Sequence, residues 1–511
     1  MANRAAHLFA RAGDCADKTA LIFEDERIDF GTLARHVQEV AGGLAHLGIR
    51  KGTHVGILIP SCPDFIIVQQ ALFALGAVVT PLNILYRPSE IADAVMSCDL
   101  AWLVSTQALL EPLDIAQPLP GLSFIGIDMQ GSDGPVHSLP AALTASQPLQ
   151  KLADVAPNDL AMLLLTSATT GKAKGVMLSC ANLAANYDRT PQWLGLDGDA
   201  VILCALPLYN TFGLNQGINA MLVTGATMVL HPRFDAGHCI EAIAAHGCTF
   251  LPAVPTMLQK IVDHPAVATA RMETLTRIMT GGAPVPPALL QRLLAAAPQA
   301  EVLTGYGLTE GTALVTLTRI RPDGNGAPSN GHTIGRVLDG MTLGIMDEQG
   351  RLMPAGGIGE IVIRGPNMMA GYYRAPQESA LALAGGWLHS GDIGYLDEDG
   401  HAYIVDRKKD VIIRGGQNIY PADIEEVLYH IPGVAEVAVV GMPDDLMGEV
   451  PVAFVALRPG CTLSGGAMLE RCRTELAPFK LPFAIHVRDE LPKGPTGKIL
   501  RRALRPGKIA R

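Results

Sequence analysis

Short runs of β-branched residues alternate with Ala- and Leu-rich helical stretches along most of the chain, and this order limits the folds open to it. HVGILIP (54–60) precedes DFIIVQQALFALGAVV, and AWLVS (101–105) follows another helical segment. Two later apolar runs, at 227–231 and 248–254, each precede a further helical region. Strands that alternate with helices form parallel sheets with helices packed on their faces. The sequence therefore predicts layered α/β structure.

The pattern changes after about residue 325, where Gly-rich turns separate short strands such as EIVIRG (360–365) and HAYIVD (401–406). Such a meander predicts a β-rich, barrel-like subdomain. Beyond Arg407 the chain returns to alternating strands and amphipathic helices, in a stretch the size of one small α+β domain. We therefore expect an N-terminal domain at 1–407 and a small C-terminal domain at 408–511.

Two segments between the regular elements have loop-like compositions. The charged run DRKKD, at 406–410, has no apolar periodicity and is the predicted linker. Residues 112–158 are rich in Pro, Gly, Ser and Asp, which are typical turn residues. We expect that second segment to be irregular surface.

The composition excludes several classes of protein. A formal net charge of -10 over 511 residues gives no basic surface for nucleic acid, so small-molecule partners are expected. The nine cysteines are scattered and form no CxxC pair, which indicates reduced thiols in the cytoplasm. Arg4 and Arg11 interrupt any signal-peptide core, and no run approaches the ~18 apolar residues of a membrane span. No GxSxG elbow is present, which disfavours a serine hydrolase.

The segment LLLTSATTGKAKGVMLS, at 163–179, carries the strongest chemical signal. An apolar strand leads into small hydroxylated residues, two glycines and two lysines. Hydroxyls, backbone N–H groups and ammonium groups in so short a loop suit the phosphates of a nucleotide. A polar surface turn is the alternative. The segment is not a Walker loop, because Ala173 follows Lys172 where that motif needs Ser or Thr.

TSATTGKAKGV also resembles the phosphate loop of the adenylate-forming superfamily, which includes acyl-CoA synthetases, aryl-CoA ligases, luciferases and peptide-synthetase adenylation domains. Further family signatures follow in the family's order: LPLYNTFG, VPTM, TGGAP, TGYGLTE, GWLHSGDIGYLDEDG, VDRKKDVIIRGGQNIYP, VVGMPDDLMGE and LPKGPTGKILRR. The match extends from the N-terminal third to the end of the chain. The sequence as a whole is similar to AMP-forming acyl-CoA synthetases such as long-chain-fatty-acid-CoA ligases.

The resemblance implies a two-step ligase that uses ATP, Mg²⁺ and CoA. Tyr306 would stack on adenine, Thr309 would meet the α-phosphate and Glu310 would bind Mg²⁺, while Asp392 and Arg407 would contact the ribose. The implied nucleotide residues are Thr166, Ser167, Thr169, Thr170, Gly171, Lys174, Gly282, Ala283, Tyr306, Gly307, Asp392 and Arg407. Two of these residues also have a structural interpretation when their motifs are considered by themselves. Tyr306 would then be a buried core tyrosine, and Asp392 would only stabilise a glycine-containing turn.

The C-terminal motifs imply a moving catalytic group. Lys498 lies in a Gly-Pro-Thr-Gly-Lys turn, where a mobile cation can relieve the repulsion between a carboxylate and an anionic phosphate. By resemblance, the C-terminal domain is mobile, Lys409 is its hinge, and Gly415 with Gly416 lines the thiol channel. The final basic residues form either a solvated tail or a patch for CoA phosphates or an acidic carrier protein.

Several positions depart from the family pattern. Ala168 and Ala173 replace the usual glycine and proline, and Cys180 and Thr304 replace a common histidine and glutamine. The implied acyl pocket comprises Tyr209, Asn210, Gly281 and Gly305. Asn210 stands where amino-acid-activating relatives have an aspartate, so a free α-amino acid would lose its countercharge. Asn210 either meets a hydroxyl of the acid or only packs beside the pocket.

The sequence therefore predicts an enzyme that adenylates a fatty or aryl/hydroxy acid, releases pyrophosphate and transfers the acyl group to CoA. One alternative is an acyl-AMP ligase that loads a carrier-protein phosphopantetheine or stops at the adenylate. Another is a non-catalytic nucleotide-binding protein of the same fold, which the departures at Ala168, Ala173 and Cys180 would favour. A homodimer is expected because dimers are common among large cytoplasmic enzymes.

Overall fold

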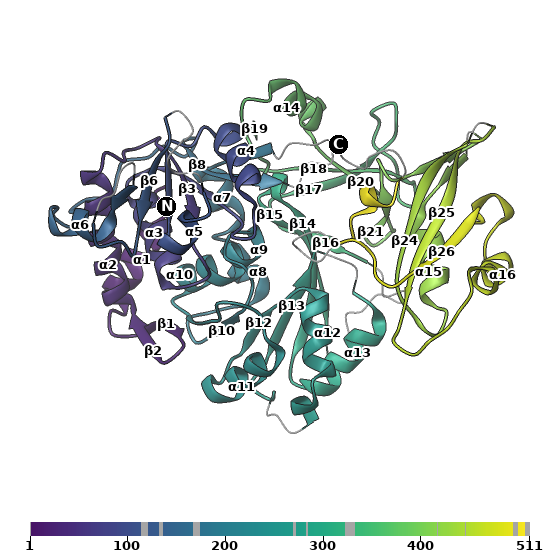
Figure 1. The fold of residues 1–511 in the computed structure, drawn as a ribbon, viewed down its shortest axis with the longest axis horizontal. Helices are drawn as coiled ribbons and strands as arrows, with labels where there is room; N and C mark the ends of the chain where they lie inside the picture. Colours follow the sequence, from purple (N-terminus) through teal and green to yellow (C-terminus); the bar gives the residue numbers. More distant parts are fainter. Residues whose placement is uncertain are drawn as a thin grey trace. The chain divides into compact units, whose positions relative to one another are not determined.

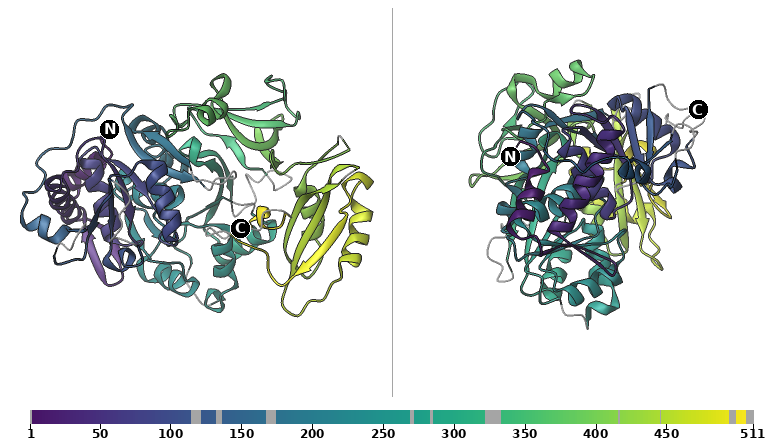
Figure 2. Two further views of the ribbon diagram at one scale, coloured as in Figure 1. Left: turned by 45° about the horizontal axis from the view of Figure 1, so that its top comes forward. Right: turned by 90° about the vertical axis from the view of Figure 1, so that its left-hand side faces the viewer.

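The computed structural model describes residues 2–113, 121–131, 136–166, 174–268, 272–282, 285–321, 333–415, 417–444, 446–493 and 499–505. The chain divides into two compact units (Figures 1 and 2). Unit 1 comprises Met1–Leu343 and Ile363–His389, and unit 2 comprises Gly344–Val362 and Ser390–Arg511.

The first sheet of unit 1 has a parallel centre and antiparallel ends. Its strands lie in the order β16 (Gly335–Val337), β15 (Ala313–Ile320), β14 (Glu301–Leu308), β13 (Arg277–Gly281), β12 (Phe250–Pro252), β10 (Val201–Cys204), β11 (Thr227–Leu230), β1 (Thr19–Phe23) and β2 (Glu26–Asp29). The run from β14 to β1 is parallel, while β15, β16 and β2 pair antiparallel. The carboxyl ends of β13 and β14 therefore meet at one edge, and both end in candidate site residues.

The second sheet of unit 1 is also mostly parallel. Its order is β19 (Gly371–Tyr372), β9 (Lys174–Ser179), β8 (Leu160–Thr166), β4 (Val78–Pro81), β3 (His54–Leu58), β5 (Trp102–Ser105), β6 (Ser123–Gly126) and β7 (Val136–Ser138). Strands β8, β9 and β19 pair antiparallel. A cluster of buried side chains that includes Leu58, Val78 and Leu163 packs against this sheet.

The helices of unit 1 follow the apolar spacing of the sequence. In α2 (Phe30–His46), Leu33, Val37 and Leu44 fall on one buried face, and the Asp29 carboxylate caps its first turn by accepting from the Thr32 N–H. The others are α1 (Ala6–Asp14), α3 (Pro63–Ala74), α4 (Pro88–Cys98), α5 (Gln107–Leu110), α6 (Leu139–Thr144), α7 (Cys180–Asn186), α8 (Thr190–Leu194), α9 (Thr211–Gly213), η1 (Leu214–Asn219), α10 (Ala220–Thr224), α11 (Ala236–His246), α12 (Pro255–Asp263), η2 (Pro265–Ala268), α13 (Pro287–Ala296), η3 (Thr309–Gly311), α14 (Pro376–Ala382) and η4 (Ala384–Gly386).

The expectation that residues 112–158 form only irregular surface is wrong. Two strands, β6 and β7, extend the second sheet in parallel, and α6 follows them. Phe124 and Val136 are buried in the core cluster of that sheet. Because these strands have three or four residues between turn residues, they are too short to show the alternation that identifies a strand.

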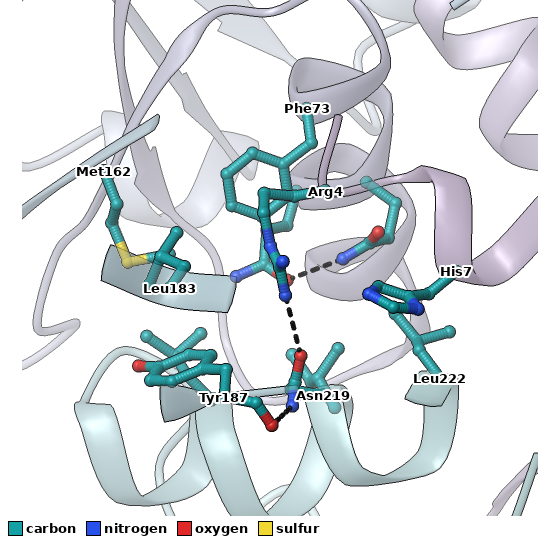
Figure 3. A pocket seen from close by; sticks show the side chains of 12 residues that line it. Arg4, His7, Phe73, Met162, Leu183, Tyr187, Asn219 and Leu222 are labelled. Carbon is teal, nitrogen blue, oxygen red and sulfur yellow. Dashed lines mark hydrogen bonds between the residues drawn. The ribbon is translucent and has the colours of Figure 1, made fainter. Parts of the chain in front are cut away.

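A small cavity of about 20 Å³ lies inside unit 1 (Figure 3). Arg4 donates to the Asn219 side chain at 3.2 Å beside it. The buried Tyr187 hydroxyl has no hydrogen-bond partner among the residues that the structure describes. Since the space suits about one water molecule, this cavity is not a substrate pocket.

Unit 2 contains two sets of strands. The first set runs in the order β17 (Thr342–Met346), β18 (Gly359–Arg364), β20 (Leu388–Leu396) and β21 (His401–Arg407), where β17, β18 and β20 each share a few residues with unit 1. The second sheet has the order β23 (Gln417–Ile419), β22 (Ile412–Arg414), β25 (Gly448–Leu457) and β24 (Val434–Asp444), with β26 (Ala484–Arg488) parallel to β25.

The second sheet of unit 2 is covered on both faces. Ile424 of α15 (Pro421–Tyr429) and Met468 of α16 (Gly465–Glu475) pack on the face that carries Val439. The opposite face, with Phe454, is covered by Leu491, Ile499 and Leu504. Two 3₁₀ turns, η5 (Pro478–Lys480) and η6 (Arg501–Ala503), complete the unit.

These elements confirm the predicted fold class, in which α/β layers and a β-rich region precede a small α+β module. The mobility of that module and its boundary after Arg407 stay predictions.

Candidate functional site

The predicted phosphate loop lies between two paired strands. Thr166 ends β8, Lys174 begins β9, and these two residues are partners in the antiparallel pair. The Lys174 Nζ lies 3.9 Å from Glu378 Oε1 and 5.2 Å from the centre of the Tyr372 ring. The candidates Ser167, Thr169, Thr170 and Gly171, and the departures Ala168 and Ala173, lie outside the described residues.

Thr309 and Glu310 form a tight turn directly after β14. The Thr312 N–H donates to the Thr309 carbonyl at 2.9 Å, and Thr312 adopts a φ of 69°, which is uncommon for a residue with a side chain. Thr312 is fully buried, and its hydroxyl donates to the Asn367 carbonyl. The Asn367 side chain donates to the Gly311 carbonyl at 2.8 Å. The fold therefore holds this turn in one conformation.

Residues 367–373, which we call the bridging segment, connect the Glu310 turn to the phosphate-loop strand. The Ala370 and Tyr373 N–H groups donate to carbonyls of β9 at 2.9 and 2.8 Å. The Met369 N–H donates to the Glu310 carbonyl at 2.8 Å, and the Tyr372 hydroxyl donates to Glu310 Oε1 at 3.0 Å. The bridging segment thus brings Lys174 and Glu310, which are far apart in sequence, to the same tyrosine.

Tyr372 contacts two of the candidate site residues, and the sequence did not indicate it. The tyrosine pair in AGYYR was the only signal, and it contains no charged group with an evident function. Burial, followed by the negative charge of Glu310, raises the pKa of the Tyr372 hydroxyl. The hydroxyl therefore remains a hydrogen-bond donor at neutral pH.

The residues around Glu310 fit a magnesium ion that is shared with phosphates. Among the described residues, no three His, Cys, Asp or Glu side chains gather as a metal site. Mg²⁺ commonly uses one or two carboxylates and completes its shell with phosphate oxygens and water. Glu310 would hold the ion, which would neutralise phosphate charge when bound.

Glycines form the edge where β13 and β14 end. Gly281 pairs with Gly305, and a Cβ at Gly281 would lie 2.6 Å from the Gly305 carbonyl oxygen. A Cβ at Gly307 would lie 1.7 Å from the Ala313 carbonyl oxygen, so only glycine fits there. Gly282 has a φ of 80°. Between these glycines Tyr306 is only 9% exposed, so a stacked adenine could reach only a small part of its ring. Ala283 lies outside the described residues.

Asn210 has a structural partner inside the implied acyl pocket. Its side-chain oxygen accepts from the Gly213 N–H at 3.1 Å and caps α9, which continues into the π-helix η1. No other described residue hydrogen-bonds its side chain. The neighbouring Tyr209 is half-buried, and burial raises the pKa of its hydroxyl. Asn210 therefore has a role in helix capping whatever the acid is.

Two departures from the family pattern have ordinary structural positions. Cys180 is buried at the start of α7, which is capped by Ser179 and Asn182, and Thr304 pairs with Thr318 between β14 and β15. None of the nine cysteines is in a disulfide.

In unit 2, Asp392 and Arg407 form a pair across β20 and β21. Arg407 Nε lies 2.8 Å from Asp392 Oδ1, and the two residues are register partners. The Asp392 side chain is 5% exposed, whereas that of Arg407 is 52% exposed. The neighbouring Lys408 pairs with Glu360 at 3.0 Å. The structure thus joins the two residues that the resemblance assigned to the ribose.

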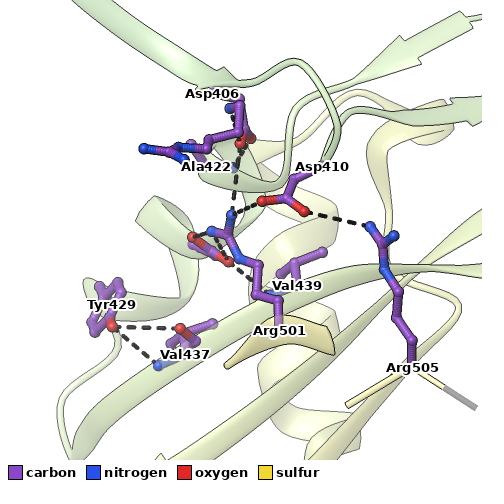
Figure 4. A network of polar contacts seen from close by, with 10 residues as sticks. Asp406, Asp410, Ala422, Tyr429, Val437, Val439, Arg501 and Arg505 are labelled. Atoms are coloured by element: carbon purple, nitrogen blue, oxygen red, sulfur yellow. Dashed lines mark hydrogen bonds and ion pairs between the residues drawn. The ribbon is translucent and has the colours of Figure 1, made fainter. Parts of the chain in front are cut away.

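Lys409 follows β21 and interacts electrostatically with Asp410 and Arg501, which belong to a buried network of charges (Figure 4). Burial lowers the pKa of its ammonium group. In that network Arg501 contacts the carboxylates of Asp406, Asp410 and Glu425. The Asp406 carboxylate also accepts from the Ala422 N–H at 2.9 Å. One guanidinium group therefore links β21, the residue that follows the predicted hinge, and α15.

Gly415 follows β22 with a φ of 57°, and its N–H donates to the Met447 carbonyl at 2.8 Å. A Cβ at Gly415 would lie 2.9 Å from Met447 Cε. Gly416 and Lys498 lie outside the described residues. The chain on either side of Lys498 is fixed, because Lys493 pairs with Ile499 and the Leu500 N–H donates to the Pro492 carbonyl at 2.7 Å.

Along the described part of the chain, no helix combines the length and apolar character that are needed to cross a membrane.

Comparison with known proteins agrees with this arrangement. Residues 8–373 match the AMP-binding enzyme family, and residues 423–498 match the AMP-binding enzyme C-terminal domain. A 3-[(3aS,4S,7aS)-7a-methyl-1,5-dioxo-octahydro-1H-inden-4-yl]propanoyl:CoA ligase of Mycobacterium tuberculosis is 36% identical, over 96% of each chain. A feruloyl-CoA synthase of an Amycolatopsis species is 34% identical, over 95% of each chain.

A solved structure, ATP-bound MatB from Rhodopseudomonas palustris, superimposes with a TM-score of 0.89 at 30% identity and covers 98% of each chain. These findings confirm the predicted class of reaction, an ATP-dependent ligation of a carboxylic acid to CoA. The chain therefore belongs to the AMP-binding enzyme family.

Proposed function

We propose that the residues described above divide the work of an AMP-forming acyl-CoA synthetase between the two units. The carboxylate of the acid attacks the α-phosphorus of ATP, forming acyl-AMP as the bond to pyrophosphate breaks. The CoA thiol then attacks the acyl carbon, gives up its proton and releases AMP. The observation that carries the proposal is the bridging segment, which joins the phosphate-loop strand to the Glu310 turn.

The groups of unit 1 act on the phosphates and the acid. Lys174 and the phosphate-loop residues Thr166, Ser167, Thr169, Thr170 and Gly171 bind phosphate oxygens through ammonium, hydroxyl and N–H donors. Glu310 holds Mg²⁺ and Thr309 donates to the α-phosphate. The glycine edge, with Gly281, Gly282, Gly305 and Gly307, lets the nucleotide and the acid approach the backbone beside Tyr306. Ala283 is a further nucleotide contact in this proposal.

The groups of unit 2 act on the ribose and on the reaction itself. Asp392 accepts hydrogen bonds from the ribose hydroxyls, and Arg407 orients this carboxylate. Lys498 neutralises the charge that builds between the carboxylate and the α-phosphate during adenylation. Lys409 is the hinge about which the C-terminal module turns, and Gly415 with Gly416 lines the passage for the thiol.

We propose that the acid has an apolar body, either fatty or aryl. Asn210 supplies no negative charge for an ammonium group, and its carbonyl oxygen is already used by Gly213. The two CoA ligases compared above are named for an alicyclic propanoate and for ferulate, which supports a bulky acid. A hydroxylated aryl acid stays open, because the Nδ2 group of Asn210 is a donor.

Substitution of Lys498 tests the catalytic assignment. Lys498→Ala should lower acid-dependent ATP–pyrophosphate exchange by about 100-fold or more and largely spare thioester formation from supplied acyl-AMP. Lys493→Ala is the matched control, because Lys493 pairs with Glu436 and should leave both half-reactions close to wild type. Equal loss of both half-reactions in Lys498→Ala would refute the assignment.

Two measurements separate the alternatives. Thioester formation with CoA and with a holo carrier protein would distinguish the two acceptors. Accumulation of acyl-AMP in the presence of either acceptor would exclude both transfer reactions. An exchange assay that is silent over fatty, dicarboxylic and hydroxyaryl acids, despite measurable ATP binding, would favour a non-catalytic protein. We further propose a cytoplasmic homodimer, which sedimentation of the purified chain and fractionation of cells would test.

A further inference from the structure

Among the described residues, a hydrogen-bond partner is found for one oxygen of the Glu310 side chain and none for the other. Oε1 accepts from the Tyr372 hydroxyl at 3.0 Å. No other described residue donates to this carboxylate. A carboxylate that is held through one oxygen keeps a fixed orientation and leaves the other oxygen for a ligand.

The Tyr372 ring serves a different group. Its face lies below the Lys174 ammonium, with 5.2 Å between Nζ and the ring centre, within the distance of a cation–π contact. A second neighbour of that ammonium among the described residues, Glu378, lies 3.9 Å away and its side chain is 46% exposed. An exposed pair at that distance constrains a lysine weakly. The ring is therefore the better-defined support for Lys174.

The backbone at Tyr372 is itself fixed. Tyr372 is paired with Val176 of β9, and its N–H donates to the Ser379 hydroxyl at 2.8 Å. The preceding Gly371 has a φ of 134° and a close neighbour in Ser379, where a Cβ would lie 3.0 Å from Oγ. This backbone delivers the tyrosine to both charged groups in one geometry.

We infer that Tyr372 is a positioning residue, which fixes the Glu310 carboxylate with its hydroxyl and supports the Lys174 ammonium with its ring. The inference rests on the roles proposed above for Glu310 and Lys174. The neutral side chain of Tyr372 then sets the distance between the Glu310 carboxylate, which would bind the cation, and the Lys174 ammonium, which would bind the phosphates. Neither charge has to pair with the other, so both stay available to MgATP.

The two parts of Tyr372 can be removed separately. Tyr372→Phe deletes the hydroxyl and keeps the ring, whereas Tyr372→Leu deletes both. We expect Tyr372→Phe to raise the Mg²⁺ concentration needed for half-maximal ATP binding by about tenfold, with ATP affinity in EDTA unchanged. Tyr372→Leu should also weaken ATP binding in EDTA. Calorimetric titration of the full chain with ATP, at a series of Mg²⁺ concentrations, measures both effects without turnover.

Tyr373→Phe is the matched control, because the Tyr373 hydroxyl lies 3.4 Å from Asp99 and does not contact Glu310. Its Mg²⁺ dependence should equal that of the wild type. Unchanged Mg²⁺ dependence in Tyr372→Phe, with or without a lower unfolding midpoint, would overturn the inference. Glu310→Gln identifies which claim has failed: if it also leaves the Mg²⁺ dependence unchanged, the proposed role of Glu310 is wrong too.

Discussion

Arg501 binds both carboxylate oxygens of Glu425, with Nη2 at 2.8 Å from Oε1 and 2.7 Å from Oε2. The same guanidinium places Nη1 3.3 Å from Asp410 and 3.7 Å from Asp406 (Figure 4). Burial raises the pKa of Glu425 and of Asp406, and the charge of Arg501 opposes this effect. One cation is therefore shared by Glu425 and by carboxylates that precede and follow Lys409 in the sequence.

Removal of that cation should destabilise unit 2. Arg501→Met would leave these carboxylates without their shared countercharge, and the loss of one partner of a buried ion pair costs about 3–5 kcal/mol. Urea unfolding of the full chain measures the change. Arg505→Met is the control, because Arg505 is more exposed and lies 3.6 Å from Asp410; it should cost less than about 1 kcal/mol. Equal losses in the two variants would contradict this account of the network.

Asp188 should give unit 1 a dependence on acid pH. Burial alone would raise the pKa of Asp188, but contacts with His7 and Arg4 outweigh it and lower the pKa from 3.8 to about 2. A carboxylate with a lower pKa in the folded state stabilises the fold above its unfolded pKa. This contribution, about 2 kcal/mol, is lost as the pH falls from about 4 to about 2.

Asp188→Asn tests that assignment. The difference in unfolding free energy between wild type and Asp188→Asn should be smaller at pH 3 than at pH 6, as measured by urea unfolding at both pH values. If the unfolding free energies of wild type and Asp188→Asn differ by the same amount at pH 3 and at pH 6, Asp188 does not supply the effect.

Asn210 should affect stability more than the choice of acid. Asn210→Ala removes the cap of α9 and should cost about 1 kcal/mol, whereas Asn210→Ser keeps a capping oxygen and should cost little. Thermal unfolding measures both. The ratio of kcat/KM for a hydroxyaryl acid to that for its dehydroxylated analogue should be the same in wild type and Asn210→Ser. A fall of this ratio by tenfold or more would show that the Asn210 amide contacts the hydroxyl.

The sequence predicted the parts of the fold that depend on long, regular patterns. The strands at β3 and β5, and the helix after β12, lie where the apolar runs placed them. Strands β6 and β7 were missed because each has only three or four residues, and their burial comes from neighbours that are distant in sequence. The local composition indicates turns around β6 and β7, because Pro and Gly residues flank them, but it does not indicate that these strands join a sheet.

In the candidate site, the family resemblance directed attention to charged residues in recognisable motifs. It assigned Asp392 and Arg407 each to the ribose, and the structure places the two side chains 2.8 Å apart. Tyr372 was not expected, because its importance comes from a hydrogen bond to Glu310 and a ring contact with Lys174. The capping role of Asn210 was missed for a similar reason, since α9 has only three residues and gives no periodic signal.

The bridging segment also sets the order in which the protein can mature during synthesis. Both strands of the phosphate-loop hairpin, and the Glu310 turn, leave the ribosome long before Tyr372 does. Contacts between residues so distant in sequence form late, because a long loop must close first. A nascent chain that ends before Asn367 would have neither β19, which pairs with β9, nor Tyr372, the hydrogen-bond partner of Glu310, so it should bind nucleotide only after the bridging segment has emerged.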